Sequence, residues 1–365
     1  MTSRRPFGTA PFSVLVALVL GGVGSAACSG SSADTSTGGD ASASGDGATS
    51  GNDASASGDG AGGGNDGGRS GDGAVAPPGT RPIFVIPMEN KAQTQIYGDT
   101  TDAPFINGTL LVKYPHTTNF NDELPLLPSE PHYVWMESGK NKFSDNTFSG
   151  DGDPTTSNST ASTDHLSAQL TTAGISWTSY QEGITAGTCP IASIGGTFYA
   201  AKHDPFVFFQ DVSGSPPSAT NANCIAHHKA LTALAGDLSA GTAATYNFIT
   251  PSLCNEMHGA SGCASGTSDA PNIKAGDDWL KNNVQPIIDY ALAHDGFVFI
   301  TWDEGDSTNL IPFIAIGNAA IAAHAGSVMY THSSLLKSEE EILGVPVLAS
   351  VSPANDFSDL FTSFP

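Results

Sequence analysis

Two apolar runs of strand length in this chain each end in a pair of oxygen-bearing side chains. The pairs and their runs are Glu89 and Asn90 after residues 83–88, and Asp303 and Glu304 after residues 297–302. Because β-branched and aromatic runs are typical of buried parallel strands, both pairs are expected at the carboxyl edge of one sheet, where open α/β sheets bind ligands. Four such residues predict a site for a hard divalent cation. Either pair alone would also suit an ordinary strand-end turn.

A serine stands at the start of a segment that is expected to be helical. Ser129 precedes residues 131–138, so its hydroxyl is expected at the N-cap or one position from it. A simple capping serine would occupy the same place. The alternative is a nucleophile, since a helix N-terminus favours a bound phosphate and a nearby cation would lower the pKa of the hydroxyl. The residues alone leave both alternatives open.

Other polar residues invite both simple and functional explanations. His258 follows a strand-like segment and therefore also stands at a strand end. His227 and His228 lie on an Ala/Leu-rich stretch and are expected at the surface. Asp277 is expected to be the N-cap of a helix over residues 278–293.

The pattern of apolar residues predicts an α/β fold. We expect a three-layer α/β/α sandwich with a largely parallel central sheet. Strands are expected near residues 83–88, 246–250, 297–301 and 311–316, and helices near residues 131–138, 226–238, 278–293 and 333–343. The Gly-, Ser- and Thr-rich residues 139–224 are expected to form the rim over the site.

The first 28 residues have the composition of an export signal. Two arginines precede an apolar segment, residues 12–23, which is too short for a comfortable membrane span, and small residues then lead to Cys28. This end resembles a bacterial lipobox, with Ser25 where that motif usually has leucine. We expect a lipoprotein of the bacterial cell envelope, anchored to the membrane through Cys28; simple signal cleavage and secretion is the alternative.

Composition separates a linker from a globular part. Residues 29–79 are almost wholly Gly, Ser, Ala, Asp and Thr, with seven aspartates against Arg69, and are predicted to be a disordered tether. Residues 80–365 are predicted to form one domain. Its 10 basic and 29 acidic residues give a net charge of −19, which argues against nucleic acid as a partner. An anionic substrate would need local attraction from a cation and a few histidines.

Four cysteines follow the tether: Cys189, Cys224, Cys254 and Cys263. An even number in an exported chain favours two disulfides, for which three connectivities are possible. The local pair Cys254–Cys263 is expected, which leaves Cys189 with Cys224. Zinc is the competing hypothesis, but the chain has no Cys-x-x-Cys pair.

Several short motifs follow one another along residues 80–365. They are the Glu-Asn pair within residues 83–98, Pro-Ser-x-Pro at 128–131, Ser138-Gly139, Ser-Trp-x-x-Tyr-x-Glu at 176–182, Lys-His-Asp-Pro-Phe at 202–206, residues 246–258, Gly-Asp-Asp-Trp-Leu at 276–280, Thr-Trp-Asp-Glu-Gly at 301–305 and Tyr-x-His-Ser-Ser-Leu-Leu at 330–336. Their order resembles the bacterial phosphoesterase family of the alkaline-phosphatase-like superfamily. That family contains acid phosphatases, phosphatidylinositol 3-phosphate phosphatases and phospholipases C.

The resemblance implies a role for particular residues of this chain. The expected ligands of one divalent metal ion, whose identity the sequence leaves open, are Glu89, Asn90, Asp303 and Glu304. The expected catalytic residues are the nucleophile Ser129 together with His203, His258 and His332. His203 and His258 would hydrogen-bond the phosphoryl group or protonate the leaving oxygen.

The chain departs from the family pattern at three positions. Leu127 stands where the family usually has histidine, His132 where it has asparagine, and Glu256 where it has aspartate. These changes leave the metal ligands in place and affect leaving-group chemistry and substrate choice.

The expected activity is that of a metal-dependent phosphomonoesterase, of the acid phosphatase or phosphoinositide phosphatase type, which forms a phosphoseryl intermediate. The substrate would be a phosphorylated small molecule or a phospholipid headgroup, and no protein partner can be inferred. Protonated histidine donors would favour an acidic pH optimum. The alternatives are a phospholipase C acting on diesters and a non-catalytic surface protein that binds a ligand at a decayed site.

Overall fold

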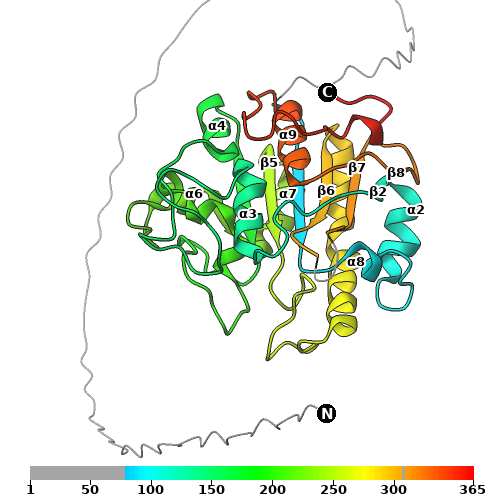
Figure 1. Cartoon of the computed structure of the whole chain (residues 1–365), viewed down its shortest axis with the longest axis horizontal. Coiled ribbons are helices and arrows are strands. Elements are labelled where there is room, and N and C mark those ends of the chain that lie inside the picture. The colour runs from blue at the N-terminus through cyan, green and yellow to red at the C-terminus, as the bar shows by residue number, and fades with distance from the viewer. Residues whose placement is uncertain (1–78, 306–308) are drawn as a thin grey trace, which may run out of the picture. The chain divides into compact units, whose positions relative to one another are not determined.

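A computed structural model of the chain describes residues 79–305 and 309–365. The predicted signal segment with Cys28, and the predicted tether except Gly79, lie outside the described residues. Within the described part, one sheet has eight strands in the order β4-β3-β5-β1-β6-β7-β2-β8 (Figure 1). The strands are β1 (Ile83–Met88), β2 (His116–Thr117), β3 (Trp177–Gln181), β4 (His228–Ala230), β5 (Tyr246–Thr250), β6 (Phe297–Trp302), β7 (Phe313–Gly317) and β8 (Ala325–Gly326).

Only β7 among these strands runs against the others. It pairs antiparallel with β6 and with β2, and every other pair of neighbouring strands in the described sheet is parallel. The predicted largely parallel sheet is therefore confirmed. The strand predicted near residues 311–316 exists, but it begins at Phe313 and is the reversed one.

Helices of very different lengths connect the strands. They are α1 (Gln93–Ile96), α2 (Leu111–Lys113), α3 (Ser129–Ser138), α4 (Leu166–Ala173), α5 (Gln210–Ser213), α6 (Ala222–His227), α7 (Leu234–Ala240), α8 (Asp269–Ala293) and α9 (His332–Leu343). Shorter turns of 3-10 or π type span Ile106–Leu110, Ala201–His203, Pro205–Phe208, Leu231–Ala233 and Ser358–Leu360.

The sheet is covered on both faces. Successive residues of a strand point to opposite faces. Phe84 of β1 meets Tyr290 of α8, with ring centroids 5.9 Å apart. Phe248 of β5, which is paired in register with Val85, meets Tyr133 of α3 at 6.3 Å. Helices α3 and α8 therefore lie on opposite faces, as the layers in Figure 1 show. This confirms the predicted α/β/α sandwich.

Burial on both faces explains why the central strands are apolar without alternation. Every residue of β1 and β6 is buried. Such strands need apolar side chains on both faces. The first charged side chains, Glu89 and Asp303, therefore appear directly after these strands end.

Two helix predictions are wrong in detail. The helix expected over residues 226–238 is divided into α6 and α7 by the short strand β4, which extends the sheet beside β3. Asp277 is not an N-cap of its own helix, because α8 already begins at Asp269. Its carboxylate instead accepts the backbone N–H groups of Phe105 and Ile106, at 2.9 and 2.8 Å, and so caps a neighbouring turn.

Residues 139–224 are more than a rim. They contain α4, α5, the start of α6 and β3, a fully buried strand that pairs with β4 and β5. The expectation of surface loops missed this strand because Thr178, Ser179 and Gln181 make it more polar than β1 or β6. Gln181 is satisfied internally, since its side-chain amide donates to Ser179 Oγ and Thr250 Oγ1 at 3.0 and 2.9 Å.

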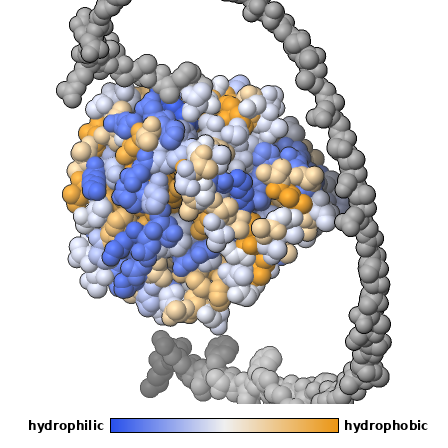
Figure 2. All heavy atoms as spheres, turned by 180° about the vertical axis from the view of Figure 1, so that it is seen from behind, coloured by the Kyte–Doolittle hydropathy of each residue, from blue (hydrophilic) through white to orange (hydrophobic). Residues whose placement is uncertain are grey.

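Both predicted disulfides are present, Cys189–Cys224 and Cys254–Cys263. On the face shown in Figure 2, hydrophobic residues lie in small groups among hydrophilic ones. Among the described residues, no helix has the length and apolar character needed to span a membrane.

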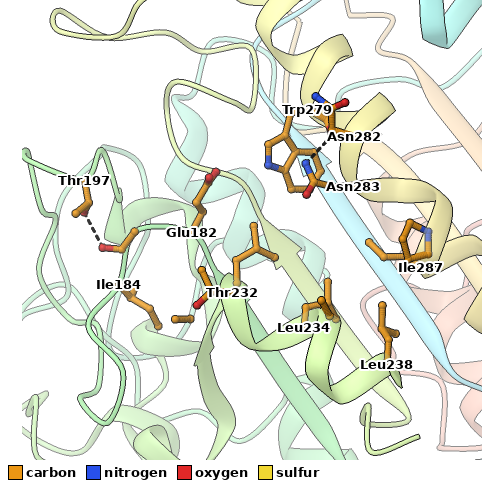
Figure 3. A pocket seen from close by; sticks show the side chains of 15 residues that line it. Glu182, Ile184, Thr197, Thr232, Leu234, Leu238, Trp279, Asn282, Asn283 and Ile287 are labelled. Carbon is orange, nitrogen blue, oxygen red and sulfur yellow. Dashed lines mark hydrogen bonds between the residues drawn. The ribbon is translucent and has the colours of Figure 1, made fainter. Parts of the chain in front are cut away.

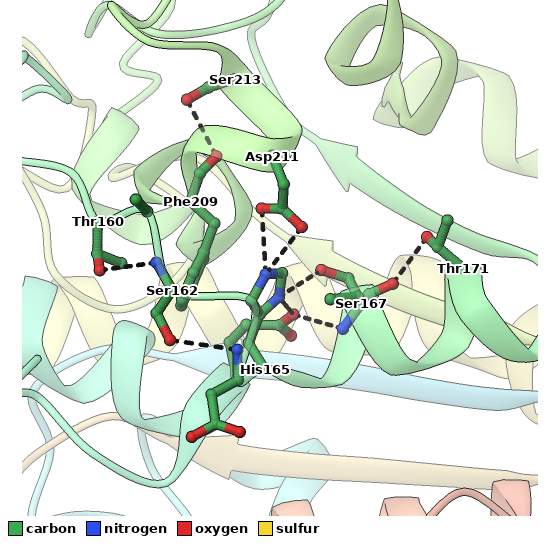
Figure 4. A network of polar contacts seen from close by, with 12 residues as sticks. Thr160, Ser162, His165, Ser167, Thr171, Phe209, Asp211 and Ser213 are labelled. Carbon is green, nitrogen blue, oxygen red and sulfur yellow. Dashed lines mark hydrogen bonds and ion pairs between the residues drawn. The ribbon is translucent and has the colours of Figure 1, made fainter.

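A buried histidine fixes the C-terminal end of α3 (Figure 4). His165 Nδ1 lies 3.0 Å from Glu137 Oε1 of α3, and its Nε2 lies 3.1 Å from Asp211 Oδ1. Glu137 also accepts the N–H of Ser167 at 2.7 Å, which ties α3 to the start of α4. Burial alone would lower the pKa of His165, but the hydrogen bonds that its ring donates to Asp211 and Glu137 outweigh this effect and raise the pKa to about 9.

Replacing His165 with alanine is expected to lower the free energy of unfolding by about 3–5 kcal/mol, because it leaves a buried carboxylate without its partner. The folded pKa lies above the ordinary value of about 6.5, so this stabilisation is fully present below pH 6.5 and is lost as the pH rises through about 9. Denaturant unfolding at a series of pH values measures both effects. The exposed His294→Ala serves as the control, and an unchanged pH slope in His165→Ala would contradict the prediction.

Candidate active site

The four predicted metal ligands lie together at the carboxyl edge of the sheet. Strands β1 and β6 are parallel neighbours in register to their last residues, so the residues that follow them are side by side. The backbone N–H of Asn90 donates to Asp303 Oδ1 at 2.9 Å. Glu89 and Asp303 are fully buried, and Glu304 is half-buried. The structure thus brings together the two pairs that are 213 residues apart in the chain.

The atoms at this edge fit a cation. The terminal amide atom of Asn90 that faces the carboxylates lies 2.9 Å from Glu89 Oε2 and 3.1 Å from each carboxylate oxygen of Asp303. Rotation of the amide decides whether its nitrogen donates to these oxygens or its oxygen joins them around an ion. Glu89 Oε1 is buried without a hydrogen-bond partner. Asn90 has a φ of 45°, a left-handed conformation that asparagine tolerates better than most residues. Oxygen donors from three side chains are the set that hard divalent cations prefer.

The carboxylates at this edge need a countercharge. Burial raises the pKa of Glu89 well above its ordinary range, and Asp303 and Glu256 raise it further. Burial also raises the pKa of Asp303. The pKa of Glu304 rises to about 8, first through burial and then through Asp303. Ionisation of one carboxylate therefore makes ionisation of its neighbours less favourable, and a bound divalent cation would offset this repulsion.

Ser129 faces this group of carboxylates. Its Oγ lies 3.1 Å from Glu89 Oε2 and 3.4 Å from Glu304 Oε1. Pro128 is the N-cap of α3, so Ser129 is the first helical residue, one position from the cap as the sequence allows. Ser129 is almost fully buried, and its hydroxyl makes no capping bond to its own helix. The structure therefore favours the hydroxyl that faces the ligands over the simple cap.

The N-terminus of α3 offers less to a phosphate than the sequence suggested. The N–H of Glu130 is already used, since it donates to Asp151 Oδ1 at 3.1 Å. Pro131 has no N–H to offer. Neither of these two positions therefore offers an N–H group to a bound phosphoryl group.

His203 lies between two carboxylates. Its Nε2 is 3.2 Å from Glu89 Oε1, and its Nδ1 is 3.0 Å from Glu256 Oε1. These distances are short, but the Glu89, Glu256 and Nε2 atoms complete no well-aligned hydrogen bond. The ring stacks on Tyr133 with centroids 4.9 Å apart. Ligand atoms of the three residues lie within 4.8 Å of one another, a spacing compatible with a metal ion. Burial, followed by Lys202 and His258, lowers the pKa of His203 well below its ordinary value.

The other two predicted histidines lie at different depths. The ring of His258 is 6.0 Å from that of His203, and its Nδ1 lies 2.7 Å from the Gly259 carbonyl oxygen. His332 is buried, and its Nε2 lies 2.9 Å from the carbonyl oxygen of Trp302, the residue before Asp303. Burial, followed by neighbouring His132, lowers the pKa of His332 to about 4. His332 therefore supports the end of β6, whereas His203 lies beside Glu89 and Glu256 and His258 lies next to His203.

Several residues of the site were missed or misjudged from sequence. His132 lies with Nδ1 2.9 Å from the Pro128 carbonyl oxygen and Nε2 2.8 Å from Asp122, which fixes the chain just before Ser129. Burial would lower the pKa of His132, but Asp122 and Asp303 raise it to about 9. No pattern around Asp122 pointed to it.

The expectation that His228 lies at the surface is wrong. It is buried, and its Nε2 lies 3.1 Å from Asp204 Oδ2. Glu182 also has a structural role: its carboxylate accepts the N–H of Ser252 at 2.8 Å and the side-chain amide of Asn255 at 2.9 Å. It thereby holds the loop that carries Glu256 and His258.

Glu182 also lines a cavity of about 560 Å³ (Figure 3). Its walls are formed by α7 and α8, including Leu234, Leu238, Trp279 and Ile287. It includes none of the predicted metal ligands or catalytic residues.

Comparison with known proteins identifies the class. The sequence profile of the Phosphoesterase family matches residues 125–346, and the chain belongs to that family. The fold is shared with solved structures of the alkaline phosphatase superfamily. A superfamily protein from Vibrio parahaemolyticus has a TM-score of 0.50 and 11% identity over 77% of this chain and 70% of its own. A phosphonate monoester hydrolase from Silicibacter pomeroyi has a TM-score of 0.50 and 11% identity over 78% and 77%.

Curated relatives add the reaction class. The phosphatidylinositol-3-phosphatase of Mycobacterium tuberculosis (strain ATCC 25618 / H37Rv) is 26% identical over 286 residues, 76% of this chain and 82% of the relative. The phosphate-repressible acid phosphatase of Penicillium chrysogenum is 27% identical over 234 residues, 60% of this chain and 50% of the relative. The chain spans about half the length of that fungal enzyme. Family and relatives together show a hydrolase that acts on phosphoric ester bonds.

Proposed function

We propose that the protein is an exported, metal-dependent phosphomonoesterase that acts through a phosphoseryl intermediate on Ser129. The observation that carries the proposal is the position of Ser129 Oγ, within hydrogen-bond distance of two of the four clustered metal ligands. The relatives support a monoester, since the names of both describe phosphatases. Export is supported by the two disulfides, which persist mainly in oxidising compartments.

Glu89, Asn90, Asp303 and Glu304 would hold the cation, which when bound supplies positive charge beside the phosphoryl oxygens. Ser129 Oγ attacks phosphorus, and its proton passes to a facing carboxylate oxygen of Glu89 or Glu304. The phosphorus–oxygen bond to the leaving alcohol breaks as the bond to Oγ forms. Water then attacks the phosphoserine and releases phosphate, which restores the serine hydroxyl.

His258 is the proposed acid for the leaving oxygen. Because the carbonyl oxygen of Gly259 accepts the Nδ1–H, the Nε2 remains for proton transfer. It would protonate the leaving alcohol in the first step and take a proton from water in the second. Burial lowers the pKa of His258 below its ordinary value of about 6.5, so the acid form is present only at lower pH.

Replacing His258 with asparagine is expected to lower kcat about 100-fold for alkyl phosphates, whose leaving oxygen needs a proton. The loss should be much smaller for 4-nitrophenyl phosphate, because nitrophenolate leaves without one. For the wild type, the alkyl phosphate rate should fall as the pH rises through a pKa below 6.5, and this limb should disappear in the variant. Equal losses on both substrates would show that His258 does not protonate the leaving group.

A substrate panel tests the function as a whole. Initial rates for 4-nitrophenyl phosphate and bis-4-nitrophenyl phosphate would be measured from pH 4 to pH 9, with and without chelator. The proposal expects faster turnover of the monoester, loss of activity with chelator and recovery on adding a divalent cation. Preference for the diester would show that the protein is a phosphodiesterase rather than a phosphomonoesterase. Activity that persists in chelator would contradict the proposed metal dependence.

A further inference from the structure

A second cavity, of about 410 Å³, adjoins the proposed site. We call it the Lys202 pocket and define it by six of its lining residues: Asp151, Phe198, Ala200, Lys202, Leu253 and Ala260. Its walls come from three loops that are far apart in the sequence. One of them carries Ala260 and is closed by the Cys254–Cys263 disulfide. The pocket therefore has a covalently constrained wall rather than three free loops.

The pocket is joined to the reactive centre by an ion pair. Lys202 Nζ lies 2.6 Å from Asp151 Oδ2, and Asp151 Oδ1 accepts the N–H of Glu130, the residue after Ser129. Lys202 itself directly precedes His203. Glu130 also accepts the N–H of Gly152 at 2.7 Å, so the loop with Asp151 is held against the start of α3. One wall of the pocket is thus fixed to the helix turn that carries the nucleophile.

Phe198 is held in an unusual backbone conformation at the mouth of this pocket. Its φ is 60°, a left-handed conformation that is strained for a bulky residue. The surroundings enforce it: the Phe198 carbonyl accepts the N–H of Leu253 at 3.0 Å. The ring lies against the disulfide loop, since a Cβ on Gly262 would be 3.1 Å from Phe198 Cζ. The half-buried ring is therefore fixed in place, with part of its surface left for a ligand.

The charge of the pocket selects against anions. Lys202 is the basic residue among its lining side chains, and Asp151 neutralises it. Asp153 adds a second carboxylate to the lining, where it accepts from Ser193 Oγ at 2.6 Å. The remaining wall, with Phe198, Ala200 and Leu253, is apolar. A group entering this pocket meets an aromatic ring, aliphatic carbon and a net negative charge.

We propose that the Lys202 pocket is the leaving-group subsite and that it takes an uncharged, ring-shaped alcohol, which stacks on Phe198. This inference rests on the proposed phosphomonoesterase function. In-line displacement requires the leaving oxygen opposite Ser129 Oγ, so the alcohol must extend into space that borders the site. A phosphoinositide headgroup is disfavoured, because its leaving alcohol keeps a negatively charged phosphodiester and the pocket has a net negative charge. Aryl or uncharged ring phosphates are therefore the expected substrates.

Removing the ring of Phe198 tests the subsite. The variant is Phe198→Gly, because glycine adopts a positive φ without strain and the loop is expected to keep its conformation. Rates of the complete, metal-loaded protein would be measured with phenyl phosphate and methyl phosphate. The ratio of kcat/KM for phenyl over methyl phosphate is expected to fall about tenfold, the typical effect of losing an aromatic or apolar contact. Phe143→Ala, a matched deletion of a half-buried ring in another loop, should leave the ratio within twofold of wild type.

A charge test accompanies the ring test. Wild type should discriminate against 4-carboxyphenyl phosphate relative to phenyl phosphate, and Asp151→Asn should reduce this discrimination about fivefold. The asparagine oxygen can still accept the N–H of Glu130, so the wall is retained.

The subsite would be contradicted by an unchanged phenyl-to-methyl ratio in Phe198→Gly, or by an equal fall of that ratio in Phe143→Ala. The proposed function would still hold in that case if wild type hydrolyses the monoesters in a reaction that depends on Ser129. Failure of wild type to hydrolyse either monoester would overturn both.

Discussion

Replacement of Ser129 with alanine is expected to reduce kcat/KM for 4-nitrophenyl phosphate by at least about three orders of magnitude. The reason is that the hydroxyl is the atom that attacks, and no neighbouring group can take its place. Glu89 and Glu304 lie 3.1 and 3.4 Å from Oγ, but in the proposed site both carboxylates bind the cation. In wild type, acid quenching during turnover should trap a phosphate on Ser129 that mass spectrometry detects. In the variant, that adduct should be absent while metal binding persists, because the four ligands are intact.

Ser138→Ala is the matched control for this experiment. Ser138 lies at the other end of α3, is equally buried, and donates to the Val134 carbonyl at 2.8 Å. Its loss should reduce thermal stability more than Ser129→Ala does, yet leave kcat/KM within about threefold of wild type. A Ser129→Ala variant that retains a tenth or more of the wild-type rate would show that water attacks phosphorus directly, and the phosphoseryl mechanism would be wrong.

Replacement of Asp303 with asparagine is expected to weaken the binding of a divalent cation by at least about 100-fold and to abolish detectable turnover. Even residues that only orient a metal ligand typically change affinity 10- to 100-fold, so loss of a buried carboxylate ligand should do no less. Asp303 is fully buried and accepts the N–H of Asn90 at 2.9 Å. Calorimetric titration of the chelator-treated protein with divalent cations measures the affinity directly.

The same variant makes an opposite prediction for stability. In chelator, the variant should melt at or above the wild-type temperature, since it removes one of several carboxylates that burial and mutual repulsion destabilise. At a cation concentration of about 100 times the wild-type Kd, the free energy of unfolding of wild type should rise by about 2.7 kcal/mol. Wild type should then be more stable than the variant. Asp278→Asn, which removes only an exposed partner of Lys274, should shift neither curve. A wild type that is equally stable with and without cation would contradict the metal site.

Much of the site could be predicted because its residues stand at the ends of apolar strands. The central strands β1, β5 and β6 are buried on both faces and rich in apolar residues, so they were recognisable, and the polar residues that follow β1 and β6 mark an edge of the sheet. The pairs Glu89–Asn90 and Asp303–Glu304 were found in this way, and the structure confirms that they meet. Their roles as ligands stay predictions.

The prediction failed where burial did not depend on apolar side chains. Strand β3 is polar, and its Gln181 is satisfied only by partners from the same sheet, so its sequence looked like a loop. His228 is buried against Asp204, and the carboxylate of Asp277 accepts two backbone N–H groups. In both cases the partners come from other parts of the chain. Local patterns carry no record of such partners.

The sequence by itself determined which apolar segments form the central strands and which polar residues follow them. It also determined that those polar residues are of the kind that binds a divalent cation. The tertiary structure alone decided that Ser129 faces Glu89 and Glu304 and that Lys202 and Asp151 connect a pocket to the first turn of α3. It also decided that His332 contacts the carbonyl oxygen of Trp302. The physical reason is one of range. Periodicity and strand ends are set by neighbours in the chain, whereas the direction of a buried polar side chain is set by partners up to 213 residues away.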